Sequence, residues 1–347
     1  MGTSAHLDRF VLEHLPPADQ QPDLTFDLPE LAYPDQLNAG VELLRRAIAA
    51  AGPDARALID FDQEFSWSRV DAISDRMARV LVKDMGLIPG TRVLLHGPNA
   101  SWTVLAWFAI LKAGGVVVAT MPMLRAAELA TVINKARISH ALVYKTLSEA
   151  VAEAKASAPV LTRVMDSASL QKAAQALPAD SRFDAVDTAS DDPALIAFTS
   201  GTTGKPKGCV HFHRDILAMA DTFGRHIVGL TRHDIIVGTP PIAFTFGLGG
   251  LVVFPAAVGA ATAFADSPGF SALAETIARH RATALCTAPT GYRALLKLTG
   301  DHDLSSLRTC VSAGEALPTA TSDAWHEATG VRIIDGIGST EMIHVFI

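Results

Sequence analysis

The sequence shows a repeated alternation of short apolar strands and helices, which determines the class of fold it can adopt. Its clearest instance starts with a strand over 92–95, continues with a helix over 102–112 and ends with the Val-rich strand 116–120. Gly97-Pro98-Asn99 predicts the turn into that helix, and Gly114-Gly115 predicts its end. Parallel strands need crossover connections, which helices supply. We therefore expect a βαβ unit in a parallel sheet that is covered on both faces.

Flanking segments extend this unit in both directions. The other elements expected in the first half are helices over 36–52, 68–83 and 126–136, a hairpin formed by 57–60 and 64–67, and a strand over 141–144. Residues 145–191 are richer in Ala, Ser and Asp and have a weaker strand pattern. We interpret 145–191 as a connection between two lobes.

A second strand–helix series occupies the C-terminal half. Its expected strands are 195–198, 235–238, 261–265, 284–287, 308–312 and 331–335. The apolar run 251–265 is interrupted by Pro255 and Gly259 and is too short to span a membrane, so it predicts a buried helix followed by a strand. The expected fold class is α/β, with two lobes of mostly parallel β-sheet flanked by helices. We place an N-terminal lobe at 1–190 and a second lobe at 191–347.

Composition excludes several classes of function. A formal net charge of -7 gives no general attraction to nucleic acid or to an anionic membrane, so a small-molecule ligand is favoured. The three cysteines, Cys209, Cys286 and Cys310, lack metal or redox spacing and predict reduced, partly buried thiols. Charged residues interrupt the first 17 positions where a signal peptide needs an apolar core. These features predict a globular cytoplasmic protein.

One segment directly after the expected strand 195–198 has the chemistry of a phosphate cradle. Small hydroxyl residues and glycines let backbone N–H groups surround a polyphosphate, and two lysines supply positive charge. The residues are Thr199, Ser200, Gly201, Thr202, Thr203, Gly204, Lys205, Pro206, Lys207 and Gly208. No Gly-Lys-Ser/Thr opens a helix here, which disfavours a P-loop ATPase or nucleotide kinase. The alternative is a flexible linker, but a linker rarely follows a buried strand in this way.

The cradle resembles the phosphate-binding signature of the superfamily of acyl-CoA synthetases, nonribosomal peptide adenylation domains and luciferases. Two later segments agree in order and spacing: 312–318 is similar to the adenine-contacting loop of that superfamily, and 335–341 to the motif that closes over the nucleotide. The resemblance implies the N-terminal domain of an adenylate-forming enzyme. The cofactors and substrates that it implies are ATP, Mg²⁺ and coenzyme A.

The resemblance also assigns roles to individual residues. It implies that Lys207, Thr340 and Glu341 take part in catalysis, with Thr340 bonded to the α-phosphate and Glu341 holding Mg²⁺. The alternative for Glu341 is an ordinary solvated carboxylate. Besides 199–205, the implied nucleotide-binding residues are Gly314, Glu315, Ala316, Asp335, Gly336, Ile337 and Gly338. Ile337 departs from the family pattern, because relatives commonly have a tyrosine there that stacks on the base.

The acid-binding residues come from two segments. In 241–249 the resemblance implies a gating position for Phe244 and an acyl-facing position for Phe246. The run 338–346 is similar to benzoate and 2-aminobenzoate CoA ligases, which implies that Gly338 and His344 line an aryl site. Ordinary core packing is the alternative for Phe244, Phe246 and His344. A strand would place both phenylalanines on one face in any case. Tyr292 is interpreted as a helix-surface aromatic residue.

The function implied is that of an aryl-CoA ligase, which adenylates an aromatic acid such as benzoate or 2-aminobenzoate and then transfers it to coenzyme A. An adenylation domain that loads a carrier protein and a non-catalytic nucleotide-binding module remain alternatives. The chain ends at Ile347, before the mobile C-terminal domain of the family. We therefore expect a fragment that lacks this domain, retains aryl-adenylate binding and is impaired in thioester formation. His211 and His213 lack a third ligand, so no further metal site is expected.

Overall fold

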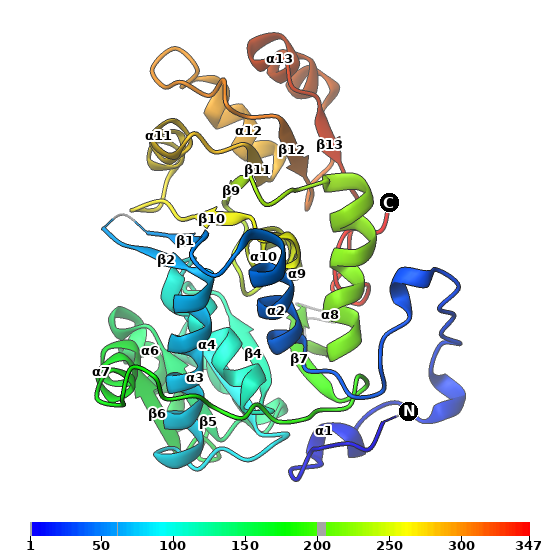
Figure 1. Ribbon diagram of the computed structural model, residues 1–347, viewed down its shortest axis with the longest axis vertical. Coiled ribbons are helices and arrows are strands. Elements are labelled where there is room, and N and C mark those ends of the chain that lie inside the picture. The colour runs from blue at the N-terminus through cyan, green and yellow to red at the C-terminus, as the bar shows by residue number, and fades with distance from the viewer. Residues whose placement is uncertain (1, 61, 200–205) are drawn as a thin grey trace. The chain divides into compact units, whose positions relative to one another are not determined.

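A computed structural model describes residues 2–60, 62–199 and 206–347 (Figure 1). The chain forms two compact units, each with its own sheet. Unit 1 comprises 1–42, 71–98 and 102–221, and unit 2 comprises 43–70, 99–101 and 222–347. The expected α/β class with two mostly parallel sheets is confirmed.

Unit 1 is built on a six-stranded sheet in the order β6-β5-β3-β4-β7-β8. Its strands are β3 (Arg92–His96), β4 (Val116–Thr120), β5 (His140–Val143), β6 (Arg163–Asp166), β7 (Pro193–Thr199) and β8 (Lys207–Phe212). All neighbours are parallel except β7 and β8, which form an antiparallel pair. The expected βαβ unit is present as β3, α4 (Ser101–Lys112) and β4.

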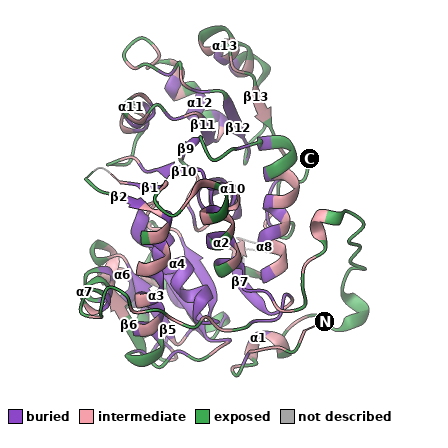
Figure 2. Ribbon diagram, viewed as in Figure 1, coloured by how far each residue is buried: buried purple, intermediate pink, exposed green. Residues whose placement is uncertain are grey.

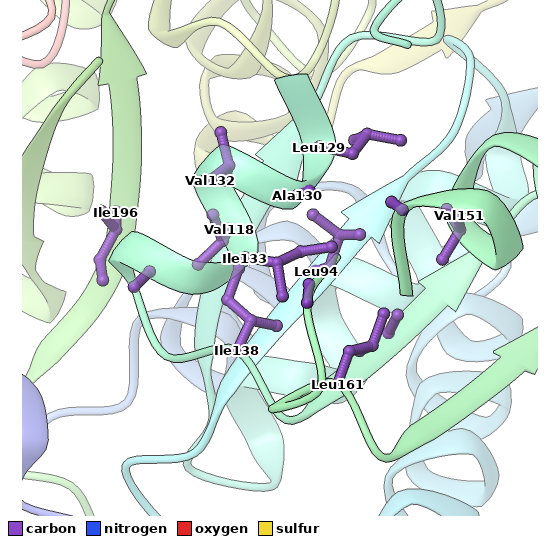
Figure 3. Close-up of a cluster of buried hydrophobic side chains, with 14 of the residues drawn as sticks. Leu94, Val118, Leu129, Ala130, Val132, Ile133, Ile138, Val151, Leu161 and Ile196 are labelled. Atoms are coloured by element: carbon purple, nitrogen blue, oxygen red, sulfur yellow. The ribbon is translucent and has the colours of Figure 1, made fainter. Parts of the chain in front are cut away.

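Unit 1 buries apolar residues because a parallel sheet must be covered on both faces. The strand β4 is buried along its whole length (Figure 2). In the core cluster of Figure 3, Leu129 and Ile133 from α5 pack with Leu94 and Val118 from the strands. The helices of unit 1 are α1 (Phe10–Glu13), α5 (Ala126–Lys135), α6 (Ser148–Ala156), α7 (Ser167–Gln175), α8 (His213–Met219), most of α3 (Trp67–Lys83) and of α4, and the 3₁₀-helices η1 (Ala18–Gln20), η2 (Pro29–Leu31) and η3 (Lys145–Leu147).

A buried ion-pair network joins α3 to α4 within unit 1. Lys112 Nζ lies 2.6 Å from a carboxylate oxygen of Asp71 and 2.6 Å from one of Asp75. The side chains of Lys112 and Asp75 are only 3% and 7% exposed. A charge at this depth is tolerated because it is paired.

Unit 2 is built on a seven-stranded sheet in the order β13-β12-β11-β9-β10-β1-β2. Its strands are β1 (Arg56–Ile59), β2 (Glu64–Ser66), β9 (Ile235–Gly238), β10 (Ala261–Ala263), β11 (Ala284–Thr287), β12 (Thr309–Ser312) and β13 (Ile333–Asp335). Only the predicted hairpin of β1 and β2 is antiparallel. All the other neighbours are parallel, as the strand–helix alternation predicts.

Helices connect the parallel strands β9 to β13 of unit 2. They are α9 (Thr245–Leu248), the π-helix η5 (Gly249–Val253), α10 (Phe254–Val258), α11 (Phe270–His280), α12 (Pro289–Leu296) and α13 (Thr319–Thr329). Most of α2 (Ala39–Ala51), which precedes β1, and most of the π-helix η4 (Ala220–Val228), which precedes β9, also belong to unit 2. Tyr292 of α12 is fully buried, packs edge-on against Trp325 and donates a hydrogen bond to the carbonyl oxygen of Val311. The interpretation of Tyr292 as a helix-surface residue was therefore wrong. Among the described residues, no helix is long and apolar enough to cross a membrane.

Two expectations about domain organisation differ from the structure. β7 pairs with β4, so the strand expected at 195–198 belongs to the sheet of unit 1 and not to a lobe that starts at 191. Residues 145–191 contain α6, β6 and α7 and belong to unit 1, and are not a connection between units. β6 pairs with β5 in full register although it is only partly buried, which explains its weak apolar pattern.

Candidate functional site

The predicted phosphate cradle connects the two antiparallel strands of unit 1. Thr199 ends β7, Lys207 begins β8, and these two residues are paired across the hairpin. The Lys207 side chain is exposed, and Lys135 Nζ donates to the carbonyl oxygen of Pro206 at 2.7 Å. The remaining cradle residues, Ser200, Gly201, Thr202, Thr203, Gly204 and Lys205, lie outside the described residues. The next described element after β7 is the antiparallel strand β8 and not the helix that follows a P-loop, which agrees with the sequence argument against a P-loop ATPase.

In unit 2, the predicted adenine-contacting loop leaves the end of β12. Gly314 has a positive φ of 92°, a backbone conformation that favours glycine. Gly314, Glu315 and Ala316 are all exposed. The Thr290 hydroxyl, at the start of α12, donates to Glu315 Oε2 at 3.0 Å and so fixes one side of the loop.

The predicted nucleotide-closing motif leaves the neighbouring strand of the same sheet. Asp335 ends β13 in register with Ser312 of β12, and Gly336 N–H donates to the carbonyl oxygen of Ser312 at 2.9 Å. Since the carboxyl ends of parallel strands lie at one edge of a sheet, the two predicted nucleotide segments emerge side by side.

Beyond β13 the chain folds back on itself. Gly338 bridges to Val345, and Ile337 exchanges backbone hydrogen bonds with Phe346 and Ile347. This hairpin leaves Ile337 63% exposed and Glu341 exposed. No group of three or more His, Cys, Asp or Glu side chains suited to a metal occurs in the described parts of the chain. A single accessible carboxylate nevertheless fits Mg²⁺, which keeps several waters and is commonly held through one or two carboxylates and substrate phosphates.

The expected strand over Phe244 and Phe246 is absent. Phe244 precedes the short helix α9, which starts at Thr245, so the two rings do not share a strand face. Phe244 is 43% exposed and Phe246 is half-buried. The helix α9 packs closely against the preceding loop, and this approach requires a glycine: a Cβ at Gly247 would lie 2.1 Å from the carbonyl oxygen of Pro241.

Asn99 fixes the loop that carries these phenylalanines. Its amide nitrogen donates to the carbonyl oxygen of Pro240 at 2.8 Å, and its amide oxygen accepts from Ile242 N–H at 2.8 Å. Sequence reasoning assigned Asn99 only to a turn. A side-chain amide can serve as both donor and acceptor, but nothing in the sequence spacing indicated this distant partner.

His344 is the most enclosed of the predicted substrate residues. It is 3% exposed, and its ring centroid lies 4.7 Å from that of Phe254, 5.4 Å from that of Phe223 and 5.7 Å from that of Phe246. Burial lowers the pKa of His344 to about 4, so the imidazole is neutral near pH 7. Phe246 and His344, which were assigned separately from sequence, are thus brought together.

Glycines allow this aromatic cluster to form. A Cβ at Gly249 would lie 2.3 Å from His344 Cδ2, and one at Gly224 would lie 2.8 Å from an atom of the Phe254 ring. Sequence reasoning missed Phe223 and Phe254, although the Phe223-Gly224 pair was a signal of close packing. Phe223 and Gly249 both lie in π-helical segments, which occur often at functional sites.

Comparison with known proteins gives one consistent result. Residues 45–347 match the family model described as AMP-binding enzyme. The chain is 30% identical over 326 residues to benzoate–CoA ligase of Thauera aromatica, which covers 92% of this chain and 62% of that protein. It is 29% identical over 322 residues to 4-hydroxybenzoate–CoA/benzoate–CoA ligase of Rhodopseudomonas palustris, with 89% and 59% covered. The chain therefore spans about three-fifths of the length of these relatives.

Solved structures agree with the sequence relatives. The anthranilate CoA ligase AuaEII, in complex with anthranoyl-AMP, superposes with a TM-score of 0.86 at 32% identity and covers 92% of this chain and 62% of its own. A benzoate CoA ligase from Burkholderia xenovorans LB400 superposes with a TM-score of 0.79 at 27% identity, with 90% and 63% covered.

Proposed function

Because the chain belongs to the AMP-binding enzyme family, we propose that it is the ATP- and acid-binding part of an aryl-CoA ligase. The proposed reaction adenylates an aromatic carboxylic acid, with 2-aminobenzoate and benzoate as the candidates, and then transfers the acyl group to coenzyme A. The observation that carries the aromatic assignment is the position of His344 among three phenylalanine rings, directly after the Thr340-Glu341 motif. A flat aryl group is favoured by aromatic neighbours through offset or edge contacts.

In the first step the acid carboxylate would attack the α-phosphate of ATP and pyrophosphate would leave. Two anions must approach each other, so positive charge has to offset their repulsion. Lys207 would supply part of this charge, and Thr340 would donate a hydrogen bond to the phosphate. When bound, Mg²⁺ would neutralise further phosphate charge, and Glu341 would hold it.

The residues proposed to contact the adenine are Gly314, Glu315, Ala316, Asp335, Gly336, Ile337 and Gly338. An exposed Ile337 offers an aliphatic surface to the base, where relatives commonly have an aromatic ring. Thr199 would contact phosphate at the end of β7. Phe244, Phe246, Gly338 and His344 would contact the acid.

Coenzyme A is the proposed acceptor because the most similar relatives described above are named as CoA ligases. A carrier protein is the second candidate, because the motifs of this chain also resemble those of nonribosomal peptide adenylation domains. Thioester formation by the full-length protein with coenzyme A, and none with a carrier protein, would separate the two. The reverse result would assign an adenylation domain that loads a carrier.

The proposed function is tested by calorimetric titration of this chain with non-hydrolysable acyl-AMP analogues. We expect the benzoyl and 2-aminobenzoyl analogues to bind at least tenfold more tightly than a medium-chain fatty acyl analogue. Preference for the fatty acyl analogue would overturn the aryl assignment. Failure of every analogue to bind would overturn the proposed binding function of this chain.

A further inference from the structure

The two ring nitrogens of His344 have different surroundings. Nε2 lies 3.3 Å from the carbonyl oxygen of Phe246, whereas Nδ1 is buried and has no hydrogen-bond partner. A carbonyl oxygen can only accept, so the proton of the neutral imidazole is on Nε2. Nδ1 therefore presents a lone pair, which makes it a hydrogen-bond acceptor without a donor.

The neighbours of this acceptor are apolar. The rings of Phe223, Phe246 and Phe254 surround the imidazole, and Gly249 packs against its Nε2 side. Buried polar atoms in proteins nearly always have a partner, so an acceptor left alone at this depth calls for an explanation. A bound ligand that carries a hydrogen-bond donor would be the missing partner of Nδ1.

The backbone next to His344 carries a second signal. Ile343 has a φ of +61°, and a β-branched residue in the left-handed region is a genuine outlier. Such strain persists only where the surrounding structure enforces it, and it is concentrated at ligand-binding sites. Here the bridge of Gly338 to Val345 and the bond from His344 N–H to the Met342 carbonyl oxygen hold the turn that aims the imidazole.

We propose that His344 Nδ1 selects aromatic acids whose ring carries an N–H or O–H substituent. This inference rests on the proposed aryl-CoA ligase function and specifies its substrate class. A ring donor would bond to Nδ1, whereas an unsubstituted or methylated ring would leave the acceptor unpaired. A site built around a hydrogen bond discriminates against an analogue that lacks the donor, while an apolar wall does not.

The test compares amino with methyl substituents, which are similar in size. The affinities of this chain for aminobenzoyl-AMP and methylbenzoyl-AMP analogues are measured by calorimetry for the 2-, 3- and 4-substituted rings. At one ring position we expect the amino analogue to bind about tenfold more tightly than the methyl analogue. This difference corresponds to one net buried hydrogen bond. The variant His344→Phe is expected to bring that ratio close to one.

Phe223→Leu is the matched control, because it changes a neighbour of the imidazole that has no polar atom. This variant is expected to weaken the binding of the amino and methyl analogues by the same factor, so the ratio of their affinities should stay the same. The inference would be overturned if the amino and methyl analogues bound the unmodified chain with similar affinity at all three ring positions. It would also be overturned if the affinity ratio stayed the same in His344→Phe. Either result would leave the proposed function intact. If no aryl analogue binds, the inference and the proposed function fail together.

Nuclear magnetic resonance of the unmodified chain provides a readout that does not depend on the folding of a variant. Long-range proton–nitrogen correlations are expected to show His344 protonated at Nε2. The Nδ1 resonance should shift with the favoured aminobenzoyl analogue and stay in place with its methyl counterpart. A proton on Nδ1 in the free chain would contradict the inference.

Discussion

Ser312 and Asp335 stand in register at the ends of neighbouring parallel strands, and Gly336 N–H closes the pair with a 2.9 Å hydrogen bond to the Ser312 carbonyl oxygen. This arrangement places two segments that are distant in sequence next to each other at one edge of the unit 2 sheet. Ligands of open α/β sheets bind beyond the carboxyl ends of the strands. The chemistry proposed for Glu315, Thr340 and Glu341 depends on that placement.

Gly249→Ala is expected to weaken aryl-adenylate binding by at least tenfold. The new Cβ would lie 2.3–2.4 Å from ring atoms of His344, so the imidazole would have to move. Calorimetry with the benzoyl-AMP analogue measures the effect. Gly300→Ala is the control, because a Cβ at Gly300 meets nothing within 4 Å. Equal affinity of the two variants would show that contact between Gly249 and His344 does not position the site.

Glu341→Gln is expected to remove most of the dependence of ATP binding on Mg²⁺, because an amide is a much weaker ligand for this cation than a carboxylate. Glu341 is exposed, so the melting temperature should change little. Titration with a non-hydrolysable ATP analogue, with and without Mg²⁺, measures the change. The exposed Glu327→Gln of α13 should behave as the unmodified chain. An unchanged Mg²⁺ dependence in Glu341→Gln would remove Glu341 from the metal site.

Lys112→Met is expected to destabilise the chain by about 3–5 kcal/mol, because it leaves the buried Asp75 carboxylate without its closest cation. Arg182, which is 67% exposed, lies 3.7 Å from Asp75, so Arg182→Met should cost only about 0–1 kcal/mol. Urea denaturation of both variants gives the comparison. Similar losses for the two variants would mean that burial does not set the strength of this network.

The stability of the fold is expected to fall as the pH drops from about 6.5 towards 3, in part through His213. Burial lowers the pKa of His213 to about 3, so the unfolded chain binds more protons than the folded chain in this interval. The contribution of one such group is at most about 1.4 kcal/mol per pH unit.

The variant His213→Asn tests this pH dependence. Its side-chain oxygen can still accept from Ala39 N–H, which bonds to His213 Nδ1 at 3.1 Å, but it does not titrate. Urea midpoints between pH 7.5 and 4.5 should therefore fall less steeply than in the unmodified chain. Parallel slopes in the variant and the unmodified chain would contradict the prediction.

The sequence predicted most of the fold because its strands are short, apolar and separated by periodic helices. The expected β9 and β11 bounds agree with the structure, as does the helix followed by a strand over 251–265. The domain division was not predictable in the same way. The pairing of β7 with β4, which assigns 193–199 to unit 1, is a non-local choice that a local pattern does not specify.

Local sequence supplied the candidate site residues, whose roles stay predictions. Thr199 and Lys207 were assigned from a phosphate-binding composition, and His344 from the resemblance of the run 338–346 to benzoate and 2-aminobenzoate CoA ligases. Phe223 and Phe254 were missed because their role depends on packing against His344 from distant segments. The helical conformation at Thr245, which is accompanied by a close approach of Gly247 to Pro241, was also missed.

A crystal structure of this chain with the 2-aminobenzoyl-AMP analogue would show whether the substrate contacts His344. We expect the aryl ring to lie against Phe246, with its amino group about 3 Å from His344 Nδ1. We also expect the phosphate to lie beside Thr340. An aryl ring bound away from Phe246, or an amino group turned away from His344, would overturn this expectation.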